Sequence, residues 1–216
     1  MLDLLNQEKV QTYFPAAFFL HFPAAFHQGQ PAVDKHLEYF HYTGMDFVKI
    51  QYEHPYPHLP HIQQPKDWAK FSPLKRDYFE IPLKVVEGLV KAAKKEALIL
   101  VTLYSPFMCA GQVNGQETIT RNLQEDPETT KIGMERVTES VLNFVRGCIE
   151  AGVDGFYAST QGAESFRFSD PSIFLNYIKP FDLLVMEEIN RKCIFNILHI
   201  CDYHGGYNDN RKCAGY

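Results

Sequence analysis

The stretch Leu98-Ile99-Leu100-Val101-Thr102-Leu103-Tyr104 decides the fold class of this 216-residue chain. It is a short and almost continuously apolar run, which is typical of a parallel strand that is buried on both faces. On either side of it, similar short runs predict four further strands, at 16–22, 47–53, 153–158 and 194–201. Longer segments with apolar residues at three- and four-residue steps predict helices, at 34–42, 78–95, 127–151 and 171–191.

This alternation predicts an α/β fold with a parallel sheet, either an open doubly wound sheet or a (β/α)8 TIM-type barrel. The turn after the 16–22 run, Phe22-Pro23-Ala24-Ala25-Phe26-His27, lacks the glycines of a dinucleotide-binding loop, which favours the barrel. Such barrels have eight strands in about 250 residues. We therefore predict an incomplete barrel with about five of the eight strand–helix units. It would form one partial domain over residues 1–216, with an irregular tail at 202–216.

The composition narrows the class of protein. With 45% hydrophobic and 22% charged residues, the chain resembles soluble globular proteins. A net charge of -5 argues against nucleic acid as a partner. No apolar run is long enough for a membrane span and the N-terminus has no signal-peptide pattern, so we expect a cytoplasmic protein without a membrane partner. Five scattered cysteines do not indicate a disulfide framework.

Several segments of the chain resemble the uroporphyrinogen decarboxylase superfamily of (β/α)8 enzymes. They are Val101-Thr102-Leu103-Tyr104-Ser105-Pro106-Phe107, Glu150-Ala151-Gly152-Val153-Asp154-Gly155, Ile197-Leu198-His199-Ile200-Cys201, and the linker-like Asp67-Trp68-Ala69-Lys70-Phe71-Ser72-Pro73-Leu74. The superfamily includes the haem-pathway decarboxylase and corrinoid-linked methyltransferases. Compared with the usual family length, the resemblance implies that the last three strand–helix units are absent.

The departures from the family pattern bear on which of the two activities to expect. The decarboxylases carry Arg-Gln-Ala-Gly-Arg after the first strand, where the arginines hold the substrate carboxylates. Here residues 20–24 are Leu-His-Phe-Pro-Ala, and neither leucine nor alanine can replace a bidentate guanidinium. The family's catalytic aspartate corresponds to Glu53, which keeps the acid, whereas its active-site tyrosine falls at Phe144. These departures disfavour decarboxylation.

His199 and Cys201 are the sharpest pair of candidate metal ligands. Residues two apart in a strand share a face, so both side chains would project into the barrel mouth. Imidazole with thiolate is typical of zinc sites, and a catalytic zinc takes three protein ligands. Spacing alone also allows a packed core strand, but the resemblance to the methyltransferase branch implies zinc at His199 and Cys201. The third ligand stays open, with Cys213 and His204 as candidates.

Glu53 closes the predicted strand 47–53, where barrel enzymes place working residues. We predict a catalytic acid or base there, the alternative being a solvated carboxylate. His54, His58 and His61 fit a surface loop at the mouth better than a metal cluster, because prolines keep the loop extended. Further candidates for substrate binding, for which strand capping or a surface ion pair is the alternative, are His21, Tyr104, Tyr157, Ser159 and Arg167.

Three hypotheses for the function follow. The first is a zinc-dependent, methyltransferase-like enzyme that moves a methyl group between a corrinoid protein and a small-molecule thiol. The second is a uroporphyrinogen decarboxylase that acts on a tetrapyrrole without a cofactor. The third is an inactive fragment or a structural protein, which would form homo-oligomers because an incomplete barrel exposes strand edges and apolar surface.

Overall fold

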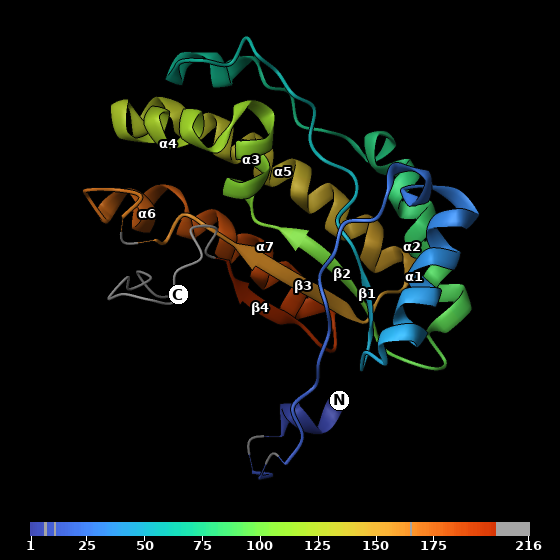
Figure 1. The fold of residues 1–216 in the computed structure, drawn as a ribbon. Coiled ribbons are helices and arrows are strands. Elements are labelled where there is room, and N and C mark those ends of the chain that lie inside the picture. Colours follow the sequence, from blue (N-terminus) through green and yellow to red (C-terminus); the bar gives the residue numbers. More distant parts are fainter. Residues whose placement is uncertain (7, 11, 165, 202–216) are drawn as a thin grey trace.

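Four parallel strands form a single sheet in the part of the chain that the structure describes. In this computed structural model, that part is residues 1–201 apart from residues 7, 11 and 165. The strands are β1 (Val48–Ile50), β2 (Ile99–Tyr104), β3 (Gly155–Thr160) and β4 (Ile197–Ile200). Each strand pairs with the next one along the chain, so their order in the sheet is β1-β2-β3-β4 (Figure 1). The predicted tail at 202–216 lies outside the described residues.

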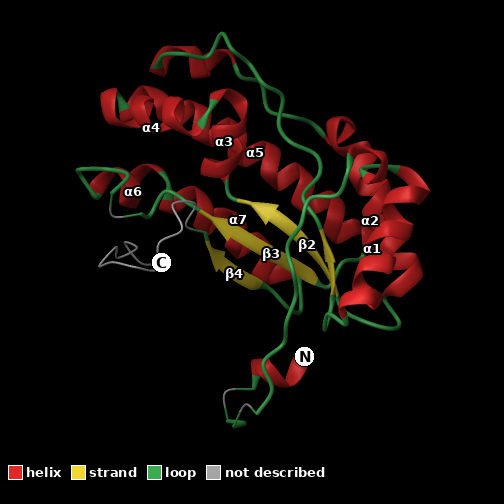
Figure 2. Ribbon diagram, in the orientation of Figure 1, coloured by secondary structure: helices red, strands yellow, loops and turns green. Residues whose placement is uncertain are grey.

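Helices connect the strands and cover one face of the sheet (Figure 2). The α-helices are α1 (Gly29–Thr43), α2 (Glu80–Ala93), α3 (Pro106–Asn114), α4 (Gln116–Glu125), α5 (Pro127–Ala151), α6 (Ser172–Tyr177) and α7 (Lys179–Lys192). Short 3-10 helices are η1 (Leu2–Leu5), η2 (Ala24–Phe26), η3 (Pro65–Lys70) and η4 (Arg76–Phe79). No helix of the described residues has the length and apolar character that crossing a membrane requires.

The two faces of the sheet differ in character. Val101 and Phe156, side chains of the helix-covered face, belong to the main hydrophobic core. The opposite face would line the interior of a closed barrel. Near the amino ends of the strands, this face carries a small apolar cluster of Phe47, Leu100 and Phe195. Towards the carboxyl ends of the strands this inner face becomes polar. The strand register there sets Thr102 beside Tyr157, and it aligns Tyr104, Ser159 and His199 in one row.

The segment 16–22 is not a strand, and this part of the prediction is wrong. The segment runs alongside β1 (Figure 1), but its backbone bonds mainly to side chains. Asp46 accepts a hydrogen bond from the Ala16 amide at 2.7 Å, Gln51 donates to the Phe18 carbonyl at 3.2 Å, and Glu53 accepts from the Phe22 amide at 2.7 Å. Side chains thus fill the space in which a backbone ladder would form. The described residues therefore hold four strands instead of five.

The predicted helices are present: α5 has the predicted bounds, whereas α1 and α2 begin and end at other residues than predicted. Gly44 and Gly152 end α1 and α5 with φ angles of 63° and 95°, the left-handed conformation that glycine tolerates. The predicted helix at 171–191 is split into α6 and α7. Two helices, α3 and α4, lie in the stretch 105–126, where the sequence analysis assigned none.

Two glycines allow close approaches between elements. An added Cβ at Gly133 in α5 would lie 2.6 Å from the ring of Trp68, a residue of η3 that is completely buried. At Gly155, an added Cβ would lie 1.5 Å from the Phe195 carbonyl oxygen. Both contacts are far inside van der Waals distance, so the packing of η3 on α5 and the path of the chain into β4 both require glycine.

Candidate functional site

Glu53 is a buried carboxylate that bonds to a backbone amide and to His21, with His27 close by; the Nε2 of His27 bonds to the Phe22 carbonyl oxygen at 2.6 Å. It lies just beyond β1, and its side chain is only 9% exposed. Its Oε1 accepts the amide hydrogen of Phe22 at 2.7 Å, and its Oε2 lies 3.1 Å from His21 Nδ1 and 3.4 Å from His27 Nε2. His21 is 55% exposed and connects the carboxylate to solvent. The segment 16–22, although not a strand, thus supplies two of the groups that position Glu53.

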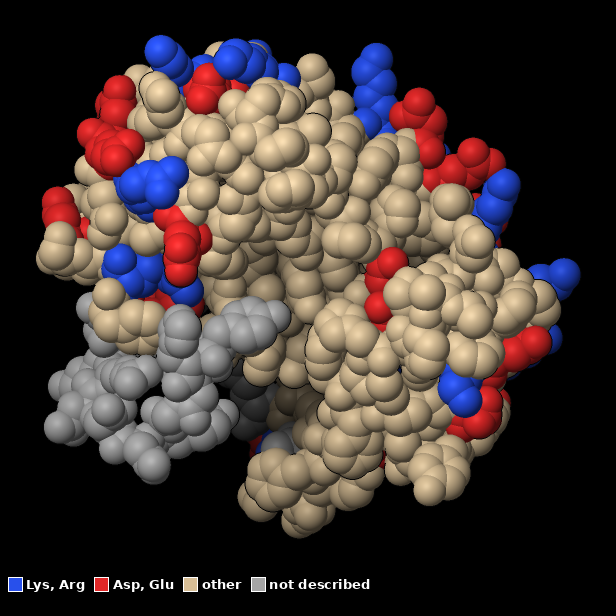
Figure 3. All heavy atoms as spheres, turned by 45° about the horizontal axis from the view of Figure 1, so that its top comes forward, with Lys and Arg blue, Asp and Glu red and all other residues tan. Residues whose placement is uncertain are grey.

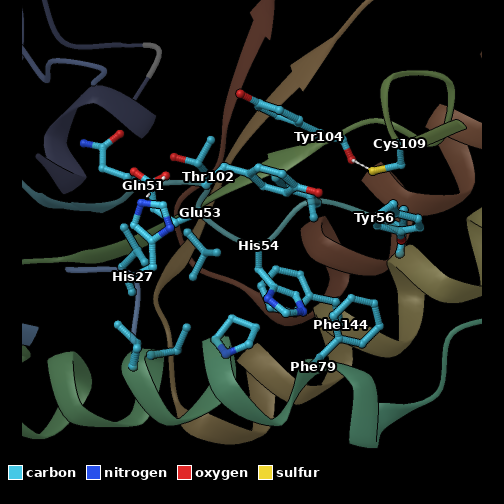
Figure 4. A pocket seen from close by; sticks show the side chains of 18 of the residues that line it. His27, Gln51, Glu53, His54, Tyr56, Phe79, Thr102, Tyr104, Cys109 and Phe144 are labelled. Atoms are coloured by element: carbon cyan, nitrogen blue, oxygen red, sulfur yellow. Dashed lines mark hydrogen bonds and ion pairs between the residues drawn. The ribbon is translucent and has the colours of Figure 1, made fainter. Parts of the chain in front are cut away.

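A narrow cavity of about 50 Å³ lies beside Glu53 (Figure 4). Glu53 and His27 lie on one side of it, and its aromatic wall contains Phe79 and Phe144. His54 also lines it, and burial lowers the pKa of this imidazole, whose Nε2 lies 3.2 Å from the Tyr78 carbonyl oxygen. Phe144, which the resemblance sets at the family's tyrosine, lines the cavity and offers it no hydroxyl.

His36 also lines this cavity and fixes the backbone next to Glu53. Its Nδ1 donates to the Ala32 carbonyl at 2.7 Å, and its Nε2 accepts the amide hydrogen of Gln51 at 3.0 Å. This pattern requires the neutral imidazole, and burial lowers the pKa of His36 accordingly. The sequence analysis did not single out His36, because its partners lie in α1 and beyond β1.

His199 and Cys201 both lie near Tyr157 on the inner face. The rings of His199 and Tyr157 are 5.4 Å apart, and the thiol of Cys201 contributes to a raised pKa of the Tyr157 hydroxyl, after the larger effect of burial. Cys201 continues the parallel pairing beyond β4, since its amide donates to the Thr160 carbonyl at 2.9 Å. Burial, with the nearby charge of Lys49, lowers the pKa of His199 and so favours its neutral form.

No three of the His, Cys, Asp and Glu side chains in the described part of the chain stand close enough to hold a metal ion together. His199 and Cys201 supply two donors, and the candidates for a third, Cys213 and His204, lie outside the described residues. On the loop that follows β1, His58 and His61 are exposed, whereas His54 is half-buried. The role of His199 and Cys201 as metal ligands therefore stays a prediction.

A model of the family described as uroporphyrinogen decarboxylase (URO-D) matches residues 40–216. The chain belongs to the uroporphyrinogen decarboxylase family. Among solved structures, it is similar to a methyltransferase from Methanosarcina mazei, with a TM-score of 0.67 and 15% sequence identity. The match covers 84% of this chain and 59% of that one, so the chain spans about three-fifths of the methyltransferase. A search of proteins with curated functions found no match.

These findings confirm the family resemblance and the α/β barrel type of fold. At 15% identity, the likeness to the methyltransferase concerns the fold alone. Residues 20–24, which the sequence analysis aligned with the family's substrate-holding arginines, precede the matched region 40–216 and belong to the segment that wraps Glu53. It presents His21 and the Phe22 amide to that carboxylate, and it carries no guanidinium.

Of the other predicted substrate-binding residues in this URO-D family chain, Tyr104 stacks on Tyr52 with ring centroids 4.1 Å apart, and Ser159 is buried. Arg167 lies at a larger cavity of about 670 Å³ but is engaged by Glu164. Its Nε and Nη2 donate to the two carboxylate oxygens of Glu164 at 2.6 and 2.7 Å. The arginine and its partner are both largely buried, so this pair is not a surface ion pair.

Lys49 is a functional candidate that sequence reasoning missed. It is 2% exposed and lies on the inner face of β1, with Nζ 4.4 Å from the ring centre of Phe19 and 4.6 Å from that of Tyr157. Burial lowers its pKa to about 8, and the described residues give it no carboxylate partner. A charged residue inside the apolar run Phe47-Val48-Lys49-Ile50 was the signal that could have revealed it.

Proposed function

We propose that this member of the URO-D family is a zinc-dependent methyltransferase that moves a methyl group from a corrinoid protein to a small-molecule thiol in the cytoplasm. The observation that carries the proposal is the approach of His199 and Cys201 to one side chain, Tyr157, on the inner face of the sheet. The fold shared with a methyltransferase supports it.

The donors fit zinc in kind. An imidazole binds zinc through a neutral nitrogen and a cysteine binds it as thiolate, and the surroundings of His199 favour its neutral form. His199 and Cys201 would hold the ion together with a third donor, for which Cys213 and His204 are the candidates. When bound, zinc lowers the pKa of a thiol that coordinates it, which makes the thiolate available at neutral pH.

The residues of the chain have defined tasks in this scheme. The thiol gives up its proton, and the proposed acceptor is the hydrogen-bonded pair of Glu53 Oε2 and His21 Nδ1 at the end of β1, which β2 and β3 separate from the strand of His199. The sulfur then forms a bond to the methyl carbon while the carbon–corrinoid bond breaks, and the corrinoid keeps that electron pair. The ammonium group of Lys49 on the inner face, which is charged below its lowered pKa of about 8, favours an anionic thiolate there.

Metal content tests this proposal. The full chain, purified without a histidine tag, should contain about one zinc ion per molecule after dialysis. His199→Ala and Cys201→Ser should lose the zinc, whereas His58→Ala, which changes an exposed histidine of the loop, should retain it. A zinc content far below one per chain that His199→Ala leaves unchanged would refute zinc-dependent transfer.

Decarboxylation of uroporphyrinogen is the second candidate, and the buried Glu53 carboxylate is the observation that favours it. A carboxylate in this position could stabilise a protonated pyrrole intermediate electrostatically. The absence of arginine at 20–24 and of a hydroxyl at Phe144 opposes it. Turnover of uroporphyrinogen that Glu53→Gln abolishes would establish this activity, and its absence in the wild type would exclude it.

A further inference from the structure

The strand β4 forms an open edge of the sheet in the part of the chain that the structure describes. In the order β1-β2-β3-β4, it pairs with β3 on one side only. Cys201 donates its amide to the Thr160 carbonyl, so Cys201 and His199, two positions before it, direct their backbone groups towards β3. The backbone N–H and C=O groups of Leu198 and Ile200 therefore point away from the sheet, where the described residues place no strand.

This edge is apolar and carries no charge. Leu198 and Ile200 are 45% and 42% exposed, and β4 contains neither a charged residue nor proline. Figure 3, in which the top of Figure 1 comes forward, shows most Lys, Arg, Asp and Glu side chains towards the outside of that face. Natural sheet edges are protected from pairing with another chain by a charge, a proline or a bulge, and β4 has none of these.

The opposite edge of the sheet, at β1, is closed. The segment 16–22 runs alongside β1 (Figure 1) and bonds to residues on both sides of it. The Asp46 amide donates to the Ala16 carbonyl at 3.2 Å. Gln51 Nε2 donates to the Phe18 carbonyl, also at 3.2 Å. Because this edge is occupied, copies of the chain cannot add head to tail, and β4 of one copy can pair only with β4 of another, about a two-fold axis.

We propose that two copies of this chain associate through β4, which pairs antiparallel with β4 of the second copy and joins the two four-stranded sheets into one. The register that sets Leu198 opposite Ile200 of the second copy keeps the hydrogen-bonded pairs within β4, because these two residues hold the outward groups. The axis then passes beside His199. The inference does not depend on zinc or on methyl transfer.

The helix side of this junction is also apolar. Leu183 of α7 is 40% exposed and lies on the flank of that helix away from α5, because Glu188 on the other flank pairs with Arg146 of α5 at 3.6 Å. The exposed parts of Leu183, Leu198 and Ile200 in two copies come to on the order of 500 Å², and an interface below about 1,200 Å² is typical of weak association. We therefore expect a dissociation constant in the micromolar range.

Sedimentation velocity of the full chain tests the proposal. It should show a monomer–dimer equilibrium without larger species, because the β1 edge is closed. Ile200→Lys adds a charge at the edge and should raise the dissociation constant about tenfold or more. The matched control, Ile81→Lys, changes an isoleucine of α2 that is 46% exposed, and it should leave the equilibrium unchanged. A chain that stays monomeric, or a dimer that Ile200→Lys leaves intact, would overturn the proposal.

A proline variant separates the loss of pairing from a loss of folding. Leu198→Pro removes an amide hydrogen that points away from β3, so the ladder between β3 and β4 keeps its bonds while a bond to the second copy is lost. Its circular dichroism should match that of the wild type, and its dissociation constant should rise. A folded Leu198→Pro variant that dimerises as well as the wild type would rule out pairing through β4.

The register also predicts a specific cross-link. Position 197 lies opposite Cys201 of the second copy in a non-hydrogen-bonded pair, with Cα atoms about 4.5 Å apart, which is within reach of a disulfide. Within one chain these positions are about 13 Å apart and cannot be joined. Ile197→Cys, oxidised in the presence of EDTA, should therefore form a covalent dimer whose peptide map joins position 197 to Cys201. Adding Cys201→Ser should abolish it, and a dimer without this link would contradict the antiparallel pairing.

Discussion

Replacing His36 with leucine should destabilise the protein by about 2 kcal/mol, because two kinds of contact are lost. The buried backbone N–H of Gln51 donates to His36 Nε2 at 3.0 Å. In the leucine variant it would lose this acceptor, at a cost of about 1–3 kcal/mol. The edge-to-face contact with Phe22, 4.8 Å between ring centroids, adds about 0.5–1.5 kcal/mol. Leucine recovers part of this total through its own apolar contacts.

Urea unfolding followed by circular dichroism measures this change, provided that the slope with denaturant stays the same. The matched control is His41→Leu on the same helix, α1, where the side chain is 56% exposed. That variant should stay within about 0.5 kcal/mol of the wild type. If His36→Leu were as stable as His41→Leu, the argument that His36 holds the backbone beside Glu53 would be refuted.

The same residue predicts a pH dependence with a definite sign. Burial lowers the pKa of folded His36 below its ordinary value of 6.5, so the unfolded chain binds the proton more readily. The contribution of His36 to stability is therefore complete above pH 6.5 and declines as the pH falls below it. The wild type should lose stability between pH 6.5 and 5.5 more steeply than His36→Leu. Parallel pH profiles would contradict a neutral, buried His36.

Three further predictions concern packing and acid stability. Gly155→Ala would set a methyl carbon 1.5 Å from the Phe195 carbonyl oxygen, so the soluble yield should collapse; a normal yield would contradict the approach of these strands. Gly133→Ala should cost about 1–3 kcal/mol and shift the fluorescence of Trp68, the single tryptophan; unchanged emission and stability would show that the helix and η3 separate easily. Bonds from Lys70 and from backbone amides hold the pKa of Asp67 at about 2, below its ordinary 3.8, so its contribution is full above pH 3.8 and is lost as the pH falls towards 2. The melting temperature of Asp67→Asn should therefore lie below that of the wild type at pH 6, with the gap narrowing below pH 4, and a gap that is constant with pH would contradict this.

The strands at the centre of the sheet were predictable because burial on both faces produces continuous apolar runs, as in 98–104. The run 16–22 has a similar composition but is not a strand. Its partners are side chains beyond and before β1, and composition does not show which group satisfies a backbone amide. The helix α3 was missed because nearly all of it is buried, which removes the alternation of apolar and polar positions. Ser105 and Pro106 at its start are the cap signal that was available.

A site residue could be predicted only where its own place in the sequence, such as the end of a strand, indicated a function. Glu53 follows a strand, and this position is the signal for it. His27 approaches Glu53, and His36 binds the backbone of Gln51, from segments that precede β1 in the sequence. For Arg167 the sequence analysis left open a substrate ligand or a surface ion pair, and the structure shows an ion pair that is largely buried. Glu164 stands three residues before it, and the structure shows that this carboxylate occupies the guanidinium.

The order β1-β2-β3-β4 has a consequence for how the protein folds as it is made. Each of β2, β3 and β4 pairs with the strand that precedes it, so none of these three must wait for a later segment before it can pair. A chain that leaves the ribosome N-terminus first can therefore add one strand–helix unit after another to an existing edge. The 16–22 segment differs, because its anchors around β1 emerge only after it does. We expect Glu53 and the histidines beside it to come together before β3 and β4 have been synthesised.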